Sequence, residues 1–247
     1  MAPTVQRTAL VTGAAGGVGR AIVAELRVNG YRVVAEDIDP SVEELAQPDL
    51  VVPFVADVTR ETSARDAVQL ACERFGRLDL LVNNAGLYLS RPLIETTVAD
   101  FDRLVSVNVK GSFLHARESV LALRETCGAI VNVSSMSGLI GMVGQAVYAI
   151  TKGALVQFTR QLAIEHAPAG IRVNAVAPGA IDTDFVAKSR TENPDPDPEA
   201  TRAAQIANHP LGRISTPEEV AQAIVWLAQA QAITGAILSV DGGFTAR

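Results

Sequence analysis

The sequence predicts an α/β protein in which helices cover both faces of a doubly wound parallel β-sheet. Two observations lead to this prediction. Short segments rich in valine and isoleucine alternate with helical segments along the 247 residues. Glycine-rich or amide-rich turns follow several of these strands, where the strands of a parallel sheet would end together. No linker or internal repeat divides the chain, so we expect a single domain over residues 1–247.

The composition argues against several classes of protein. The net charge is −6 and no basic block is present, which argues against a nucleic-acid partner. The only cysteines, Cys72 and Cys127, lack a metal-binding spacing and fit reduced thiols in the cytoplasm. No signal peptide is visible and no apolar run is long enough to span a membrane. No metal site is expected, because the three histidines are scattered at His115, His166 and His209.

The first predicted strand, Thr8–Val11, enters the glycine-rich turn TGAAGGVG at Thr12–Gly19. An amphipathic helix follows and ends at Asn29-Gly30. Glycines let a backbone approach its ligand closely, and the first turn of a helix offers unpaired N–H groups and a positive dipole. The strand–turn–helix context therefore favours a binding site for a dinucleotide pyrophosphate over an ordinary glycine-rich turn.

The second strand, Tyr31–Ala35, ends at Glu36 and Asp37. A carboxylate about twenty residues after such a turn can accept hydrogen bonds from the adenosine ribose. For Glu36, a solvated carboxylate at a strand end is a competing interpretation. The next predicted segments are a short helix at Pro40–Ala46 and a third strand at Val51–Val55.

The later elements continue the alternation, and Thr59 is expected to cap the helix that follows the third strand. They are a helix to about Phe75, a strand at Leu78–Val82 entering Asn83–Gly86, a long helix from about Ala99 towards Arg124, a helix to about His166, a strand at Ile171–Val176 entering Pro178–Thr183, a helix at Pro217–Ala228 capped by Thr216, and a last strand at Ala236–Val240.

Residues 129–153 carry the candidate chemistry. A buried-strand pattern precedes two serines, and a glycine-rich loop then leads to a helix carrying Tyr148 and Lys152. Residues four apart share one helix face, and Ser135 can fold back over that face. A hydroxyl, a titratable phenol and a nearby cation can move a proton to or from a substrate oxygen. A helix-surface pair and a serine cap are the alternative interpretation.

The ordered set of Ser135, Tyr148 and Lys152 resembles the short-chain dehydrogenase/reductase family in its single-domain form, which has a Rossmann fold. The turns of that family are also matched, by TGxxxGxG on Gly13, Gly17 and Gly19, by NNAG at Asn83–Gly86 and by PGxIxT from Pro178. The family often has Ala-Ser before the lysine, where this chain has Ile150-Thr151. Within such a fold, residues from about 1 to 130 would bind the cofactor and those from about 131 to 247 would bind and convert the substrate.

The resemblance implies roles for individual residues. The catalytic set would be Ser135, Tyr148, Lys152 and Asn108, the last of which distorts its helix in the family and binds a water that contacts the lysine. The expected cofactor-binding residues are Gly13, Gly16, Gly17, Val18, Gly19, Asp37, Ile38, Asp57, Val58, Asn84, Ala85, Gly86, Tyr148, Lys152, Pro178, Gly179, Ile181 and Thr183. The expected substrate-binding residues are Ser135, Tyr148, Leu87, Leu89, Met136, Leu139, Met142 and Phe185.

Lys152 is expected to make Tyr148 more acidic. A free tyrosine titrates near pH ~10. A cation about 5 Å away, at an effective dielectric constant of ~20, contributes roughly 3 kcal/mol, or about two pKa units. A phenolate near neutral or mildly alkaline pH would follow.

These expectations add up to an NAD(H)-dependent oxidoreductase that interconverts a secondary alcohol and its ketone. Asp37 and the absence of a side chain at Gly16 favour NAD over NADP. The substrate is expected to be small and mostly apolar, under a mobile lid at 184–210. The family resemblance implies a homotetramer. The alternatives are an NADPH-dependent reductase of 3-oxoacyl thioesters and a catalytically idle dinucleotide sensor.

Overall fold

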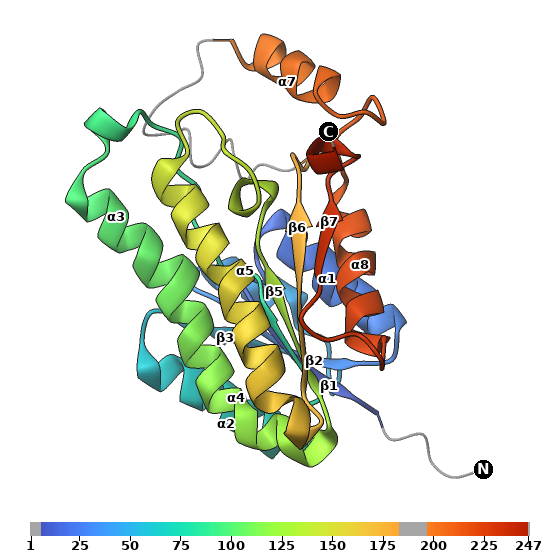
Figure 1. The fold of residues 1–247 in the computed structure, drawn as a ribbon. Helices are drawn as coiled ribbons and strands as arrows, with labels where there is room; N and C mark the ends of the chain where they lie inside the picture. Colours follow the sequence, from blue (N-terminus) through green and yellow to red (C-terminus); the bar gives the residue numbers. More distant parts are fainter. Residues whose placement is uncertain (1–5, 183–196, 247) are drawn as a thin grey trace.

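The computed structural model describes residues 6–182 and 197–246 of the chain. Helices and strands alternate through both ranges (Figure 1). The strands are β1 Thr8–Thr12, β2 Arg32–Asp37, β3 Val51–Val55, β4 Leu80–Asn83, β5 Ala129–Val133, β6 Arg172–Pro178 and β7 Ile237–Val240. The α-helices are α1 Gly17–Val28, α2 Glu61–Phe75, α3 Val98–Leu104, α4 Ser112–Thr126, α5 Ala146–His166, α7 Pro198–Ala207 and α8 Pro217–Gln229. Short helical turns lie at Pro40–Leu45, Leu93–Glu95, Met136–Gly138, Ala167–Ala169 and Phe244–Ala246.

All seven strands form one parallel sheet in the order β3-β2-β1-β4-β5-β6-β7. The predicted doubly wound α/β fold is therefore confirmed. Strands covered on both faces read as continuous hydrophobic runs, which explains why every residue of β1 and of β5 is buried.

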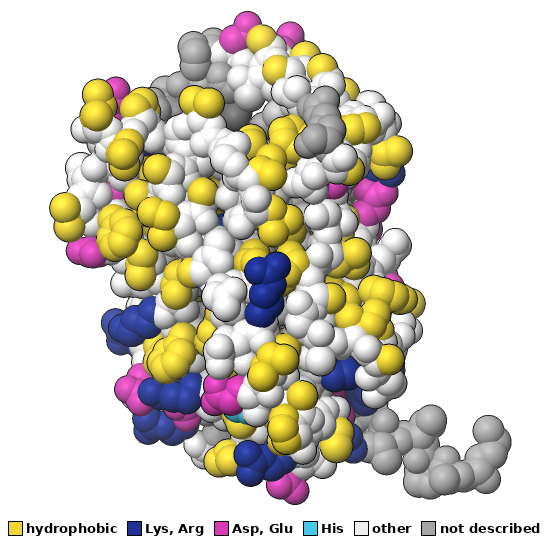
Figure 2. All heavy atoms as spheres, in the orientation of Figure 1, with side chains coloured by type: hydrophobic (Ala, Val, Ile, Leu, Met, Phe, Trp, Pro, Cys, Tyr) yellow, Lys and Arg dark blue, Asp and Glu magenta, His cyan; other side chains and the backbone are white. Residues whose placement is uncertain are grey.

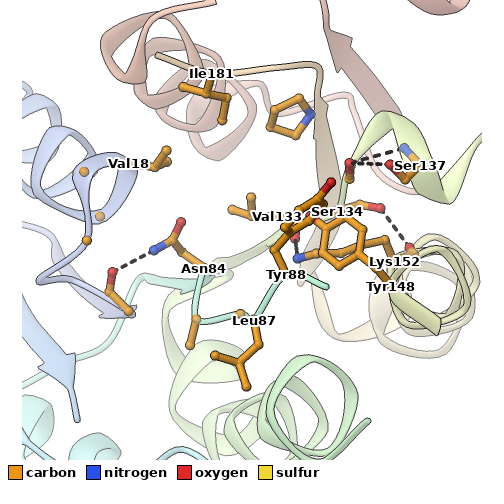
Figure 3. A pocket seen from close by; sticks show the side chains of 18 of the residues that line it. Val18, Asn84, Leu87, Tyr88, Val133, Ser134, Ser137, Tyr148, Lys152 and Ile181 are labelled. Carbon is orange, nitrogen blue, oxygen red and sulfur yellow. Dashed lines mark hydrogen bonds between the residues drawn. The ribbon is translucent and has the colours of Figure 1, made fainter. Parts of the chain in front are cut away.

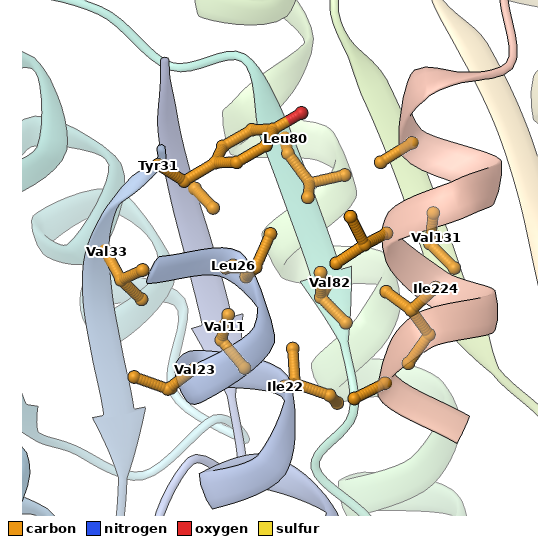
Figure 4. Close-up of a cluster of buried hydrophobic side chains, with 14 of the residues drawn as sticks. Val11, Ile22, Val23, Leu26, Tyr31, Val33, Leu80, Val82, Val131 and Ile224 are labelled. Atoms are coloured by element: carbon orange, nitrogen blue, oxygen red, sulfur yellow. The ribbon is translucent and has the colours of Figure 1, made fainter. Parts of the chain in front are cut away.

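Side chains of alternate residues in each strand enter different cores. Val11 of β1 packs with Ile22 of α1 and Ile224 of α8 in the core on one face of the sheet (Figure 4). Leu10 belongs to the core on the other face, with Val68 of α2 and residues of α4 and α5. Figure 1 shows the same division, with α1 and α8 on one side and α2, α4 and α5 on the other. Among the described residues, no helix is long and apolar enough to cross a membrane.

The long helix expected from Ala99 to Arg124 is not uniform. Its middle, Val105–Gly111, is a π-helical turn between α3 and α4. Asn108, at the centre of this turn, is fully buried. The distortion that the family resemblance implied at Asn108 is therefore present.

Of two local expectations, one is confirmed and one is wrong. The short helix expected at Pro40–Ala46 is present as a 3₁₀ helix at Pro40–Leu45, with Asp39 as its N-cap. Thr59 does not cap α2, because the N-cap position is Arg60. Asp57 Oδ1 accepts from both the backbone N–H and the hydroxyl of Thr59, which holds Thr59 in a turn before the helix. At α8 the predicted cap is confirmed, since Thr216 and Glu219 form a capping box.

The strand order reverses between β1 and β4. In doubly wound sheets, ligands bind at the carboxyl ends of the strands where the order reverses. The turn after β1 begins at Gly13 and the turn after β4 at Asn84, so the two predicted binding turns flank this position.

Candidate active site

A cleft of about 860 Å³ runs along the carboxyl ends of the strands. Figure 3 shows Val18 and Asn84 towards one end of it and Tyr148 and Lys152 towards the other. Its lining includes every predicted cofactor residue except Thr183, which lies outside the described residues: Gly13, Gly16, Gly17, Val18, Gly19, Asp37, Ile38, Asp57, Val58, Asn84, Ala85, Gly86, Tyr148, Lys152, Pro178, Gly179 and Ile181.

Two positions of the first turn have room only for glycine. Gly13 has a φ of +68°, and a Cβ there would lie 2.7 Å from the Cα of Ala85. A Cβ at Gly19 would lie 2.0 Å from the carbonyl oxygen of Gly13. At Gly16 the nearest atom to a Cβ would be 3.7 Å away, so this position can accept a side chain. The turn thus leaves the N-terminus of α1 open to the cleft, as pyrophosphate binding requires.

Asn84 joins the two turns that flank the reversal of the sheet. Its Nδ2 donates to the carbonyl oxygens of Thr12 at 3.0 Å and Gly13 at 2.9 Å. The hydroxyl oxygen of Thr12 accepts from the backbone N–H groups of Asn84 and Ala85. The side chain of Asn84 therefore stabilises the turn, while Ala85 and Gly86 line the cleft.

Asp37 is held at the end of β2, beside the glycine-rich turn. Its Oδ2 accepts from the backbone N–H of Ala15 at 2.8 Å, and its Oδ1 accepts from that of Asp39 at 2.9 Å. Each carboxylate oxygen can accept a further hydrogen bond. This fixed carboxylate faces the cleft where the resemblance expects the adenosine ribose.

Asn108 connects the π-helical turn to the catalytic segments. Its Oδ1 accepts from the backbone N–H of Leu87 at 2.7 Å, and its Nδ2 donates to Leu87 O and to Thr151 Oγ1, each at 2.9 Å. A Cβ on Gly86 would lie 3.3 Å from Lys152 Nζ and 3.4 Å from Asn108 Oδ1. Asn108 is thus behind the cleft surface and adjacent to the lysine.

Ser135, Tyr148 and Lys152 come together at the end of β5 and the start of α5. Ser135 is hydrogen-bonded to the Tyr148 phenol. Lys152 Nζ donates to the carbonyl oxygen of Val133 at 2.8 Å and lies 5.7 Å from the centre of the Tyr148 ring. The structure therefore brings together the three residues that the sequence selected.

The pKa values in the polypeptide alone differ from the expectation. Burial raises the pKa of Tyr148 above its ordinary value of 10, and the hydrogen bond with Ser135 acts in the opposite direction. Burial also lowers the pKa of Lys152 to about 8. The expected lowering of the Tyr148 pKa by Lys152 is therefore wrong for the polypeptide alone: burial raises that pKa, only the hydrogen bond with Ser135 opposes it, and the neutral phenol is favoured.

The predicted substrate residues divide into three groups. Leu87, Met136 and Met142 line the cleft with Ser135 and Tyr148. Leu89 lies beneath the surface, in a small core with Tyr148, and Leu139 is 38% exposed and outside the lining. Phe185 lies outside the described residues, as does the part of the expected lid from 184 to 196.

Sequence reasoning did not assign several residues that line the cleft. Tyr88, Ser137 and Gln145 lie beside the catalytic group. Gln145 is three residues before Tyr148 at the start of a predicted helix, which was the only available signal. Five further polar residues of the lining come from α7 and the segment after it: Thr201, Arg202, Gln205, Asn208 and His209. Within the described residues no cluster could hold a metal ion.

Comparisons with known proteins agree with this geometry. A family model described as enoyl-(acyl carrier protein) reductase matches residues 13–245. The chain is 37% identical over 246 residues to the 3-oxoacyl-[acyl-carrier-protein] reductase FabG of Thermotoga maritima, covering 96% of this chain and 97% of the relative. It is 38% identical over 250 residues to the cis-4-hydroxycyclohexanecarboxylate dehydrogenase of Sinomonas cyclohexanicum, covering 98% and 97%. The solved structure of ElxO with NADP bound superposes with a TM-score of 0.88 at 31% identity, covering 98% of this chain and 100% of that one.

Proposed function

The chain belongs to the short-chain dehydrogenase/reductase family, and from this membership we propose that it is an NAD(H)-dependent oxidoreductase interconverting a secondary alcohol and its ketone. One observation carries the proposal. Ser135, Tyr148 and Lys152 converge at one end of a cleft whose other end is the glycine-rich turn. A proton-transfer group and a dinucleotide site therefore share one continuous surface.

The residues of the cleft fit a nicotinamide dinucleotide. The glycine-rich turn would hold the pyrophosphate, Asp37 the adenosine ribose, and Lys152 the nicotinamide ribose. When bound, this cofactor supplies or accepts the hydride. Asp37 and the missing side chain at Gly16 support NAD(H) over NADP(H), because a 2′-phosphate would meet a carboxylate and no cation.

The chain's own residues would handle the proton. In alcohol oxidation Tyr148 would accept the hydroxyl proton while Ser135 binds the substrate oxygen. Lys152, held by the carbonyl of Val133, would favour the phenolate through its charge. Asn108 would hold the π-helical turn and Lys152 in their positions relative to each other.

We expect a small substrate that is mostly apolar next to its reacting carbon. Leu87, Met136 and Met142 form the apolar part of the wall there. Two arginines line the cleft, Arg103 of α3 and Arg202 of α7. Arg202 is already paired with Asp182 through two contacts of 2.9 Å, which argues against its use as a bidentate clamp for a carboxylate.

A second candidate is an NADPH-dependent reductase of 3-oxoacyl thioesters. The identity to the FabG of Thermotoga maritima and the NADP in the ElxO structure favour it. The carboxylate of Asp37 argues against the phosphorylated cofactor. An idle dinucleotide sensor has weaker support, since dinucleotide binding alone does not need Asn108, Ser135 and Tyr148 together.

Two variants test the proposed chemistry in a nicotinamide-turnover assay. Tyr148→Phe should abolish turnover and leave NADH binding nearly intact, because only the proton carrier is lost. Lys152→Ala should weaken both, since it has two roles. If Tyr148→Phe kept more than a few percent of the wild-type kcat, the acid–base assignment would be wrong.

A substrate panel distinguishes the two candidate functions. Matched secondary alcohols, hydroxy acids and 3-oxoacyl thioesters would be tested with NAD(H) and NADP(H). The proposal expects the highest kcat/KM for a neutral alcohol or ketone with NAD(H). A preference for the thioester with NADPH would establish the second candidate instead.

A further inference from the structure

A series of hydrogen-bonded side chains starts at Ser135 and ends beside Tyr148. Ser135 Oγ lies 3.4 Å from Ser137 Oγ, Ser137 Oγ donates to Gln145 Oε1 at 2.6 Å, and Gln145 Nε2 donates to the Tyr88 hydroxyl at 3.1 Å. The ring of Tyr88 meets that of Tyr148 edge-on, with 4.9 Å between their centres. Figure 3 shows Tyr88 and Tyr148 together, with Ser137 beyond them. All five residues line the cleft.

These residues belong to three separate segments. Tyr88 follows β4, Ser135 and Ser137 follow β5, and Gln145 is the N-cap residue of α5. The reaction proposed above uses only Ser135 and Tyr148. The remaining three residues therefore have polar groups in the cleft without a part in that reaction.

The direction of each hydrogen bond follows from the number of protons. A serine hydroxyl has one proton to donate, whereas a glutamine amide donates at one end and accepts at the other. Because Ser137 gives its proton to Gln145, its oxygen can only accept from Ser135. When Ser135 donates to Ser137, its proton points away from the substrate, and its oxygen can still accept from the neutral Tyr148 phenol.

Rotating the side-chain amide of Gln145 by half a turn reverses the direction of donation in these hydrogen bonds. Its NH₂ group would then donate to Ser137, and Ser137 would donate to Ser135. The Tyr88 hydroxyl can serve either arrangement, since a phenol both donates and accepts. In the reversed arrangement the proton of Ser135 is directed to the substrate oxygen, where negative charge develops and donors are needed.

We propose that Gln145, held by Tyr88, is a positioning residue whose amide orientation sets whether Ser135 accepts from Ser137 or donates to the substrate oxygen. This inference rests on the proposed function, in which Ser135 binds that oxygen. In this proposal, Tyr88 and Ser137 act together with Gln145 to orient the hydroxyl of Ser135. Gln145 lies on the helix that carries Tyr148, so the amide and the phenol keep a constant spacing.

Two substitutions of Gln145 separate this role from simple packing. Gln145→Glu keeps the shape and the acceptor for Ser137, but a carboxylate cannot donate. It therefore favours the resting direction, because Ser137 stays an acceptor for Ser135 and the arrangement in which Ser137 donates to Ser135 is lost. Gln145→Met keeps the length and removes both hydrogen bonds, which leaves the serines free to reorient. If Gln145 only packed against its neighbours, Gln145→Glu would lose less activity than Gln145→Met. Our proposal predicts that Gln145→Glu loses more.

The measurement is the pH profile of kcat for alcohol oxidation with NAD. A new negative charge by itself moves the profile to higher pH and leaves the plateau unchanged. A misdirected Ser135 lowers the plateau, and we expect about a tenfold to hundredfold loss in Gln145→Glu. The loss in Gln145→Met should be several-fold smaller, and Tyr88→Phe, which keeps the ring against Tyr148, should resemble it.

Removal of Ser137 provides a rescue test. In Ser137→Ala the proton of Ser135 has no acceptor on that side, so adding Ser137→Ala to Gln145→Glu should restore most of the plateau. Equal plateaus in the two Gln145 variants, or no rescue, would overturn the inference while the wild type stays active. If the wild-type chain shows no nicotinamide turnover with the whole panel, the proposed function and the inference both fall.

Discussion

Asp37 shows how much a single residue decides in this cleft. Both of its oxygens are fixed by backbone N–H groups, so the carboxylate cannot turn away from a 2′-phosphate. Gly16, across the turn, has open space where a side chain would begin. Repulsion together with a missing cation should amount to a few kcal/mol, or about a hundredfold in kcat/KM in favour of NAD.

The exchange of these two residues should change cofactor preference. Asp37→Ala removes the repulsion and Gly16→Arg supplies the cation without a clash, so the double variant should narrow or reverse the preference. Steady-state kinetics with NAD and NADP would measure it, with each single variant as a control. An unchanged ratio in the double variant would mean that another group discriminates between the cofactors.

Ser135 should influence the pH at which the enzyme oxidises its substrate. Burial raises the pKa of Tyr148, and the hydrogen bond with Ser135 opposes that increase. Because oxidation requires a deprotonated Tyr148, kcat/KM should increase with pH into the alkaline range. In Ser135→Ala the remaining activity should shift to still higher pH. A residual profile with an unchanged midpoint would contradict the hydrogen bond's effect on Tyr148.

At the scale of elements, the alternation of strands and helices was predictable because each has its own hydrophobic period. The π-helical turn at Val105–Gly111 was not, since no propensity marks it. Only Asn108, between two valines, suggested a change. Thr59 was misassigned because the side chain of Asp57, and not the helix, took its hydrogen bonds.

The candidate site was predictable where one residue type is obligatory and not where contacts are tertiary. Gly13 and Gly19 tolerate no side chain, and Tyr148 and Lys152 share a helix face. Tyr88 and Gln145 are 57 positions apart in sequence and meet only because β4 and β5 are neighbours. Their spacing in the chain could not reveal that contact.

A buried pair joins β2 to α4. His115 Nε2 lies 2.8 Å from Glu36 Oε2, and both side chains are inaccessible. The Nδ1 of His115 lies 2.9 Å from the carbonyl oxygen of Gly111 and must be protonated, because a carbonyl only accepts. The contact with Glu36 then requires one more proton, which the two groups share. Thus Glu36, left open between two roles by the sequence, is a buried structural residue.

This pair should make stability depend on pH. Burial alone would lower the pKa of His115, but the hydrogen bond and charge of Glu36 outweigh it and raise that pKa above its ordinary 6.5. Burial also raises the pKa of Glu36, against the effect of His115. With a raised folded-state pKa, the stabilisation is complete below pH 6.5 and is lost as the pH rises through the folded-state value.

Denaturant unfolding from pH 6 to 9, at one protein concentration, would measure the pH dependence. Glu36→Gln should flatten it at small cost, because an amide can donate to a neutral imidazole. His115→Leu should cost about 3–5 kcal/mol, since it leaves a buried carboxyl group unpaired. A slope that survives in Glu36→Gln would assign the pH dependence to other groups.

At the scale of the whole molecule, α4 and α5 present hydrophobic side chains outwards. Figure 2 shows hydrophobic side chains spread over the face that these helices form in the view of Figure 1. Phe113 is 46% exposed, Leu121 72% and Ile164 77%. Leu155 and Leu162 of α5 are buried inside the chain and do not contribute to this face. The outward-facing hydrophobic side chains thus lie on both helices.

The prediction of a homotetramer comes from the family resemblance, and this face supports it, since symmetric assemblies bury self-complementary apolar surfaces. Light scattering at micromolar concentration should give about four times the chain mass of 26.0 kDa. Ile164→Glu places a charge on the outward face of α5 and should lower that mass. Val28→Glu is the matched control, because Val28 is 83% exposed on α1, across the sheet. A wild-type monomer would refute the tetramer, and equal effects of both substitutions would show that the α4–α5 face is not the interface.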